Sequence, residues 1–290
     1  MKYRFMAEQR SLYAVKEMAE ALGVSTSGYY EWSKRGKSQR ETTREHLIFE
    51  IRQIYEENHG TYGSPRVSRE LRKKCYSSGI NRIAKLMRDN GIRAKTKRRF
   101  KITTHSDHNY PISGNLLQGE FRASGPNKVW VTDITYIWTM EGWLYLVIYL
   151  DIYSRKVVGW SLRENMKAAM IVEGLEGAVM SRSPKEGLII HSDRGSQYAS
   201  DEYRKVLKYY KFVSSMSGAG NCYDNAVAET FFHTMKTEWI YFKRYETREE
   251  AKRDIFEYIE MFYNRKRLHS TLGYLSPVEF ESAGLNSNLT

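Results

Sequence analysis

Apolar residues near the start of the chain recur at the spacing of an amphipathic helix. The positions i, i+3, i+4 and i+7 are filled by Val15, Met18, Ala19 and Leu22. Gly23 then offers a turn and Ser25 a helix N-cap, so residues 11–33 are predicted to form two short helices around a turn. This arrangement is typical of a helix-turn-helix, although a plain helical hairpin fits the pattern equally well.

Helical spacing returns in the next part of the chain. A helix is predicted at about 44–58, and two more lie within 62–94, where Gly91 ends the second. The outward positions are mostly basic: Arg66, Arg69, Arg72, Lys73, Lys74, Arg82, Lys85 and Arg88, with Arg98 and Arg99 in a short arm that follows. We interpret residues 1–101 as a tandem helical DNA-binding region, and the alternative is a charged face that is merely solvated.

From residue 129 the pattern changes to β-branched and aromatic runs. Three runs, 129–137, 143–153 and 156–162, have the length of strands and are predicted to form a meander. Alternating elements follow: a helix at 167–181, a strand at 188–191, a helix at 200–210, a strand at 212–215 and a helix at 223–240. This order predicts a ribonuclease-H-like α/β fold with a mixed five-stranded sheet, preceded by all-α modules. Trp130 and Trp143 are expected in its core.

The expected organisation has five parts. They are a helix-turn-helix-like module at 1–40, a second helical module with a basic arm at 41–101, a linker at 102–127, the ribonuclease-H-like core at 128–240 and a C-terminal helical extension at 241–290. The linker is poor in apolar residues. Its His105 and His108 have an HxxH spacing, but no nearby pair of cysteines completes a zinc site.

The charge is unevenly distributed. Lys and Arg number 46 against 34 Asp and Glu, a formal net charge of +12. Residues 1–110 hold 24 basic and 12 acidic side chains, and residues 111–290 hold 22 of each, so the excess lies in the helical part. A localised basic excess favours a nucleic acid as partner, because neutralised phosphates release counterions.

Other classes of protein are disfavoured by the sequence. The first residues carry scattered charges, unlike a signal peptide, and the longest apolar run, Trp143–Leu150, is too short to span a membrane. Cys75 and Cys222 define no disulfide framework. We therefore expect a cytoplasmic protein that is associated with the nucleoid when it binds DNA.

Three acidic residues are the candidates for chemistry. Asp133 lies inside an apolar strand, where an unpaired carboxylate is costly, and Asp193 ends the apolar strand at 188–191. Asp193 alone is also compatible with a turn, and Glu229, in the middle of a helix, with a solvated surface residue. Asp151 fits a structural turn better than metal ligation. Arg265, Arg267 and His269 either contact DNA or cover a surface.

Taken together, the three acidic residues indicate a metal site. Adjacent strands can bring Asp133 and Asp193 side by side, and a packed helix can lower Glu229 onto them. Three converging carboxylates repel each other unless a divalent cation neutralises them. Magnesium or manganese suits oxygen ligands, and two ions about 4 Å apart can clamp an in-line phosphoryl displacement.

At these residues the sequence resembles a DDE transposase of the insertion sequence three family, related to retroviral integrases. The resemblance is carried by WVTDITYI around Asp133, HSDRGSQYAS around Asp193, NCYDNAVAETFFHTMKTE around Glu229 and YNRKRLHSTLGYLSPVEF near the end. The 35 residues between Asp193 and Glu229 match the family's spacing, and Lys236 stands seven positions after the glutamate, where it could contact a phosphate.

The resemblance implies an activity and partners. A protein of this family cleaves one strand at a transposon end and transfers the 3′-hydroxyl to target DNA, using Asp133, Asp193 and Glu229 with two Mg²⁺ or Mn²⁺ ions. Homo-oligomers on DNA and fusion to the product of an upstream reading frame are implied as well, since no zipper-like heptad run is found here. The alternatives are a DNA-binding protein with a catalytically retired core and a nuclease that only hydrolyses.

Overall fold

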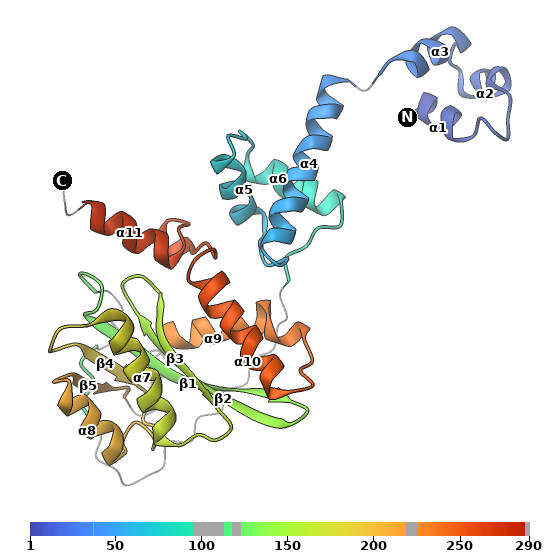
Figure 1. Ribbon diagram of the computed structural model, residues 1–290. Coiled ribbons are helices and arrows are strands. Elements are labelled where there is room, and N and C mark those ends of the chain that lie inside the picture. Colours follow the sequence, from blue (N-terminus) through green and yellow to red (C-terminus); the bar gives the residue numbers. More distant parts are fainter. Residues whose placement is uncertain (37, 96–112, 118–122, 219–225, 288–290) are drawn as a thin grey trace.

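The computed structural model describes residues 1–36, 38–95, 113–117, 123–218 and 226–287. Its first three helices, α1 (Lys2–Glu8), α2 (Val15–Leu22) and α3 (Thr26–Lys34), form a separate module at the far end of α4 (Figure 1). Their core consists of Met6, Met18, Ala19 and Tyr29. The predicted turn is confirmed, because Gly23 ends α2 at φ +60° and Ser25 Oγ accepts a hydrogen bond from Gly28 N at 2.9 Å. Helix α1 was not expected.

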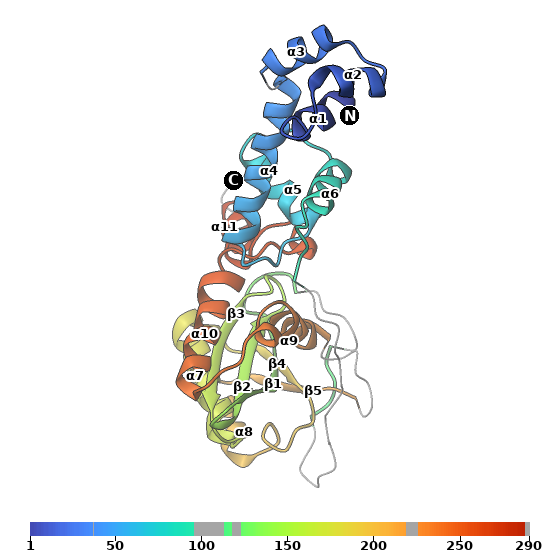
Figure 2. The same cartoon turned by 90° about the vertical axis from the view of Figure 1, so that its right-hand side faces the viewer.

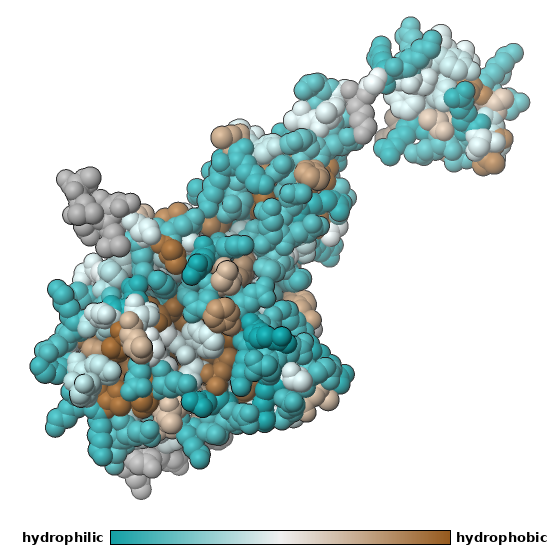
Figure 3. All heavy atoms as spheres, viewed as in Figure 1, coloured by the Kyte–Doolittle hydropathy of each residue, from teal (hydrophilic) through white to brown (hydrophobic). Residues whose placement is uncertain are grey.

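The second helical module consists of α4 (Gln39–Glu57), α5 (Ser64–Lys73) and α6 (Ile80–Asp89). Helix α4 starts earlier than predicted because Ser38 and Glu41 form a capping box, in which each side chain bonds the other's backbone N–H. Space-filling spheres show hydrophilic residues over most of the arm formed by α1–α6, and hydrophobic patches on the body below it (Figure 3).

The predicted mixed sheet is confirmed. Its strands are β1 (Val129–Thr139), β2 (Gly142–Asp151), β3 (Val157–Arg163), β4 (Ile189–Ser192) and β5 (Val213–Met216), in the spatial order β3-β2-β1-β4-β5. The meander β1-β2-β3 is antiparallel, and β4 and β5 are added in parallel to β1. Parallel pairing needs crossovers, which the helices between these strands supply.

Helices cover both faces of the sheet (Figure 2). Helices α7 (Ala168–Arg182) and α8 (Asp201–Tyr209) pack on the face that carries Trp130 and Tyr149. The opposite face, with Val131 and Leu150, lies under α9 (Ala226–Glu238), α10 (Arg248–Phe256) and the π-helix η3 (Glu257–Tyr263). Trp130 is buried as expected, but the core placement of Trp143 is wrong. Trp143 is 43% exposed because it lies at the tip of the β1–β2 hairpin.

The end of the chain contains the short 3₁₀ helices η2 (Ile240–Phe242) and η4 (Ser270–Leu272), and α11 (Pro277–Ser287). One hydrophobic cluster joins Leu47 and Ile51 of α4 to Phe231 of α9, Tyr258 of η3 and Leu268. The second helical module and the tail therefore share a core with one face of the sheet. The five-part division of the chain stays a prediction.

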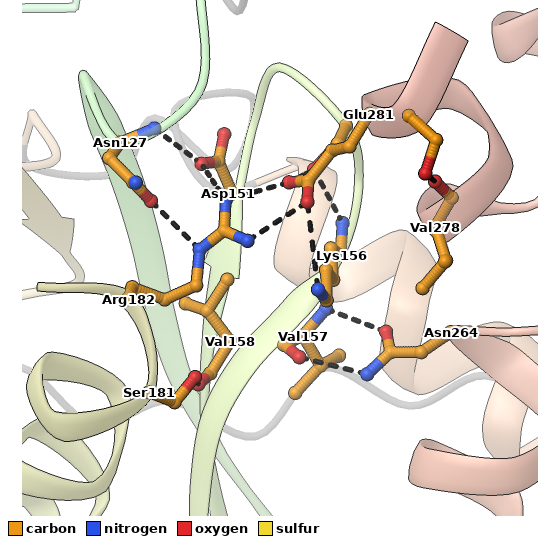
Figure 4. Close-up of polar contacts among 12 residues, drawn as sticks. Asn127, Asp151, Lys156, Val157, Val158, Ser181, Arg182, Asn264, Val278 and Glu281 are labelled. Atoms are coloured by element: carbon orange, nitrogen blue, oxygen red, sulfur yellow. Dashed lines mark hydrogen bonds and ion pairs between the residues drawn. The ribbon is translucent and has the colours of Figure 1, made fainter. Parts of the chain in front are cut away.

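A polar network attaches the tail to the sheet (Figure 4). Arg182 of α7 donates two hydrogen bonds to the Glu281 carboxylate, at 2.8 and 2.9 Å, and Lys156 lies 3.5 Å from the same group. The Asn264 amide bonds both the N–H and the carbonyl of Val157 on the edge strand β3. The Asn264 amide thus pairs backbone groups on the edge strand β3, and the contacts of Glu281 fix α11 to the core. Within the described ranges no helix is long and apolar enough to cross a membrane.

Candidate active site

Asp133 lies on β1, and Asp193 directly follows the neighbouring parallel strand β4. Val131 of β1 is paired with His191 of β4, the last pair of these two strands, and Asp133 and Asp193 each come two positions further on. Side chains two apart share a face, which puts both carboxylates on the face of Val131, under α9. Strands lie about 4.8 Å apart. The sequence-based expectation that the sheet brings the two aspartates together agrees with this register.

Glu229 reaches the same place from α9. It lies in the first turn of this helix, which packs on β1 through Val227, Phe231 and Met235. The charge of Glu229 acts on Asp133, as does that of Asp193. Residues 219–225, which include Asn221, Asp224 and Asn225 of the motif quoted around Glu229, lie outside the described residues.

The electrostatics of the site favour a bound cation. Burial, followed by the negative charge of Asp193, raises the pKa of Asp133 well above its usual range, although a hydrogen bond from Ile134 N at 2.8 Å opposes the shift. Burial also raises the pKa of Glu229. Burial and neighbouring negative charge both make it harder for these carboxyl groups to ionise. A bound divalent ion would supply positive charge and so stabilise the ionised carboxylates.

The donor set fits a hard divalent ion, since carboxylate oxygens are the ligands that magnesium and manganese prefer. One oxygen of Asp193 already accepts from Gly195 N at 2.9 Å, which orients the side chain after β4. Over the residues that the structure describes, no three acidic, histidine or cysteine side chains are grouped tightly enough to form a ready-made metal site.

Lys236 lies two turns after Glu229 on α9. Its Nζ is 4.8 Å from the centroid of the Tyr136 ring, further along β1. Burial lowers the pKa of Lys236, and the charge of Asp133 opposes this shift. The ammonium group is thus held beside the acidic centre. Its stacking on Tyr136 was not foreseen from the sequence, although position 136 is only three residues from Asp133.

The predicted DNA-binding residues differ in their exposure and in their contacts within the chain. Most are exposed on α5 and α6: Arg69, Arg72, Lys73, Lys74, Arg82 and Lys85. Several have intramolecular contacts, because Arg69 stacks on Tyr274, Lys73 pairs with Glu279 and Lys74 with Glu50. Arg98 and Arg99 lie outside the described residues.

The expected outward placement of Arg66 is wrong. Its side chain is 23% exposed, its Nε donates to the Leu268 carbonyl at 2.9 Å, and its guanidinium lies 3.6 Å from Glu238. The C-terminal segment covers this side of α5, which the periodicity of α5 alone could not reveal.

Arg267 is not a surface residue either. Its guanidinium forms two hydrogen bonds with the Glu238 carboxylate, at 2.7 and 2.8 Å, and its side chain is 5% exposed. Nearby, burial and the charges of Arg267 and Arg66 lower the pKa of His269 to about 2. Glu238 was missed in the sequence because its partners lie 29 and 172 positions away.

The expected structural role of Asp151 agrees with its contacts. Its carboxylate accepts hydrogen bonds from Asn127 N at 2.7 Å and from Tyr153 N at 2.9 Å, and its side chain is fully buried (Figure 4). One oxygen thus fixes the turn after β2, and the other holds the segment that leads into β1.

Comparisons with known families agree with this architecture. A family model described as an HTH-like domain matches residues 43–100, and two described as integrase core domains match 123–222 and 229–285. The fold and its acidic site therefore define a protein with an integrase-type core behind a helix-turn-helix-like domain.

The relatives specify the family. The transposase InsF of insertion sequence IS3A from Escherichia coli K12 is 40% identical over 287 residues, which cover 98% of this chain and all of that protein. An uncharacterised 31 kDa protein of insertion element IS600 from Shigella sonnei is 43% identical over 263 residues, 91% of this chain and 97% of that one. This chain belongs to the IS3 family of transposases.

Two solved structures align with the chain at low similarity. The catalytic core domain of HTLV-2 integrase in complex with magnesium, in its trimeric form, aligns with 14% identity and a TM-score of 0.43, over 55% of this chain and 99% of that one. A chain from the structure of a simian T-cell lymphotropic virus intasome in complex with PP2A regulatory subunit B56 gamma aligns with 14% identity and a TM-score of 0.47. The alignment covers 80% of this chain and 74% of that chain.

Proposed function

We propose that this chain is a DNA transposase that binds transposon ends, cleaves one strand there and joins the freed 3′-hydroxyl to target DNA. The observation that carries the proposal is the parallel pairing of β1, which holds Asp133, with β4, which Asp193 directly follows, beneath the helix that carries Glu229. Full-length similarity to an IS3 transposase supports the same activity.

In this proposal Asp133, Asp193 and Glu229 hold two Mg²⁺ ions, which Mn²⁺ can replace. When bound, such ions activate the attacking oxygen and stabilise the leaving oxygen of an in-line displacement. The chain's own contribution is positional. The parallel pairing of β1 with β4 would position the two aspartates, and Phe231 and Met235, which belong to the core under α9, would hold Glu229 over them. Lys236, whose charge interacts with that of Asp133, would bind a phosphate of the reacting strand.

The transfer step needs no redox partner and no covalent enzyme intermediate. The oxygen of the 3′-hydroxyl forms a new bond to phosphorus in the target strand while the existing bond from phosphorus to the 3′-oxygen of that strand breaks. The attacking hydroxyl loses its proton, and the departing oxygen gains one. Ions held by the three carboxylates, together with Lys236, would supply positive charge against the charge that develops on the phosphate oxygens.

The exposed basic faces of α5 and α6 are proposed to bind the duplex through its phosphates. A homo-oligomer on DNA would let two such chains hold two transposon ends together. Fusion to the product of an upstream reading frame remains part of the proposal, because the family resemblance implies it.

The test is a strand assay with the full chain. Duplexes that carry candidate transposon ends, labelled at one strand, are incubated with Mg²⁺ or with a chelator, and nicked and joined strands are separated by size. The proposal expects both products with Mg²⁺ and neither with the chelator. Binding without any product would indicate a retired core, and nicking without joining would indicate a nuclease.

A further inference from the structure

The tip of the β1–β2 hairpin carries aromatic side chains where a solvent-facing strand normally carries polar ones. Along the end of β1 exposed and buried positions alternate, and the exposed ones are Tyr136, Trp138 and Met140. Tyr136 is 39% exposed and Trp138 is 54% exposed, and Trp143, directly opposite Trp138 on β2, is 43% exposed. Figure 1 shows this hairpin reaching the edge of the body.

The three rings form one ordered cluster, which we name the hairpin platform: Tyr136, Trp138 and Trp143. The Trp138 and Trp143 ring centroids are 4.8 Å apart, and those of Tyr136 and Trp143 are 5.0 Å apart, both in edge-to-face geometry. Cross-strand aromatic pairs help to stabilise a hairpin. That role does not need side chains as large as two tryptophans, which here leave about half of their surface in water.

The platform is connected to the catalytic centre. Tyr136 lies three residues after Asp133 on β1, about 10 Å along the strand, which is the length of roughly three stacked base-pair steps. Because side chains three apart point to opposite faces of a strand, the connection runs through Lys236, which lies over the Tyr136 ring and interacts with Asp133. A strand whose phosphate is held by Lys236 would have its next bases beside the Tyr136 ring.

Cations flank the platform. Besides Lys236, an Arg244 guanidinium nitrogen lies 3.4 Å from Met140 Sδ, beside the hairpin tip. Flat exposed rings next to cations are the arrangement that binds single-stranded nucleic acid, in which bases stack on aromatic faces while basic groups follow the backbone. A second protein chain would gain from the apolar surface but has no need of cations placed beside it.

We propose that Tyr136, Trp138 and Trp143 stack unpaired nucleobases of the DNA strand whose end is being processed. The inference rests on the proposed function and deepens it, since it states that the substrate end is opened rather than fully paired. Stacking on rings does not depend on base identity, so the platform favours an open end of any sequence.

The experiment measures binding without divalent ions, so it does not depend on catalysis. Short duplexes of arbitrary sequence are prepared with fully paired ends or with three unpaired nucleotides, and 2-aminopurine replaces one unpaired base. The full chain is compared with a double variant, Trp138→Ala with Trp143→Ala. Tyr209→Ala, which removes an aromatic residue that is 78% exposed on α8, is the matched control.

The proposal expects the double variant to lose about 5- to 150-fold in affinity per stacked base for the open duplex, with little change for the paired one. It also expects the quenching of 2-aminopurine to disappear. The Tyr209→Ala variant should match the wild type, and Trp138→Phe with Trp143→Phe, which keeps two rings, should retain binding and quenching.

Equal affinity of the wild type and the double alanine variant for open ends would overturn the proposal. The double variant could also differ from the wild type in oligomeric mass without DNA and yet bind DNA equally well. That result would assign the platform to contacts between copies of the chain and would also overturn the proposal. Circular dichroism checks that the variants fold. If stacking is found but the strand assay with Mg²⁺ yields no product, the proposed activity fails and the platform stands.

Discussion

The ion cluster Arg66, Glu238 and Arg267 connects three distant parts of the chain, and we expect it to contribute strongly to stability. Arg66 belongs to the second helical module, Glu238 ends the helix that carries Glu229, and Arg267 lies in the tail. Their side chains are 23%, 10% and 5% exposed, respectively. Glu238 is the anion between two guanidinium groups.

The perturbation is Glu238→Gln, which preserves shape but removes the negative charge. It leaves Arg267 buried and Arg66 close to it without a counter-charge, and breaking a buried pair in this way costs about 3–5 kcal/mol. For a cooperative unit of this size each kcal/mol lowers the unfolding midpoint by about 2–4 °C, so a fall of roughly 6–20 °C is expected. Urea and thermal unfolding, followed by circular dichroism, measure both quantities.

Glu186→Gln is the matched control, because Glu186 pairs with Lys211 at 2.7 Å with both side chains about two-thirds exposed. This change should cost less than about 1 kcal/mol. Adding Arg267→Met to Glu238→Gln should recover part of the loss, since the lone buried charge is then gone. A loss below about 1 kcal/mol for Glu238→Gln, or no recovery in the double variant, would refute the assignment.

The remaining predictions concern the DNA-binding face, the buried histidine and a helix cap. Replacing Arg72, Arg82 and Lys85 together with alanine should weaken DNA binding and reduce its salt slope by about one per lost phosphate contact in filter-binding assays, and an unchanged slope would assign these groups to solvation. Because the pKa of His269 is about 2 in the folded chain, against about 6.5 when unfolded, protonation favours unfolding. Stability should then fall by about 2–3 kcal/mol between pH 6.5 and 4.5, and His269→Asn should flatten this dependence in urea titrations, whereas parallel curves would contradict the burial argument. Ser38→Ala removes the capping box of α4 and should cost about 1 kcal/mol in the same titrations, with Ser33→Ala near the end of α3 as a control that leaves that cap intact.

The local pattern of apolar and β-branched residues was sufficient to predict much of the fold. The β-branched runs around Asp133 and after Gly142 gave the central strands, because such side chains fit a pleated, half-buried surface. Alternation along β1 also determines which face Asp133 occupies. The side-by-side placement of Asp133 and Asp193 followed from one further assumption, that their strands are neighbours, which the observed register satisfies.

Contacts between remote segments could not be predicted in this way. Arg66 lies outside the apolar stripe of α5, so periodicity places it in solvent, yet residues about 200 positions later cover it. Trp143 is a large apolar residue of the kind expected in a core, but it lies at the tip of the β1–β2 hairpin and is 43% exposed. In both cases the environment is set by tertiary packing, which propensity and spacing do not contain.

The central claim is that Asp133, Asp193 and Glu229 act as a single metal-dependent unit. The direct measurement is the rate of magnesium-dependent strand joining by Asp133→Asn, by Glu229→Gln and by the variant with both changes, with Glu202→Gln, in the first turn of α8, as the control. Groups that act as a unit are non-additive, so both single variants and the double variant should be equally inactive, with DNA binding retained and the control active. Substantial joining by either single variant, or a further loss only when both are changed, would contradict the claim.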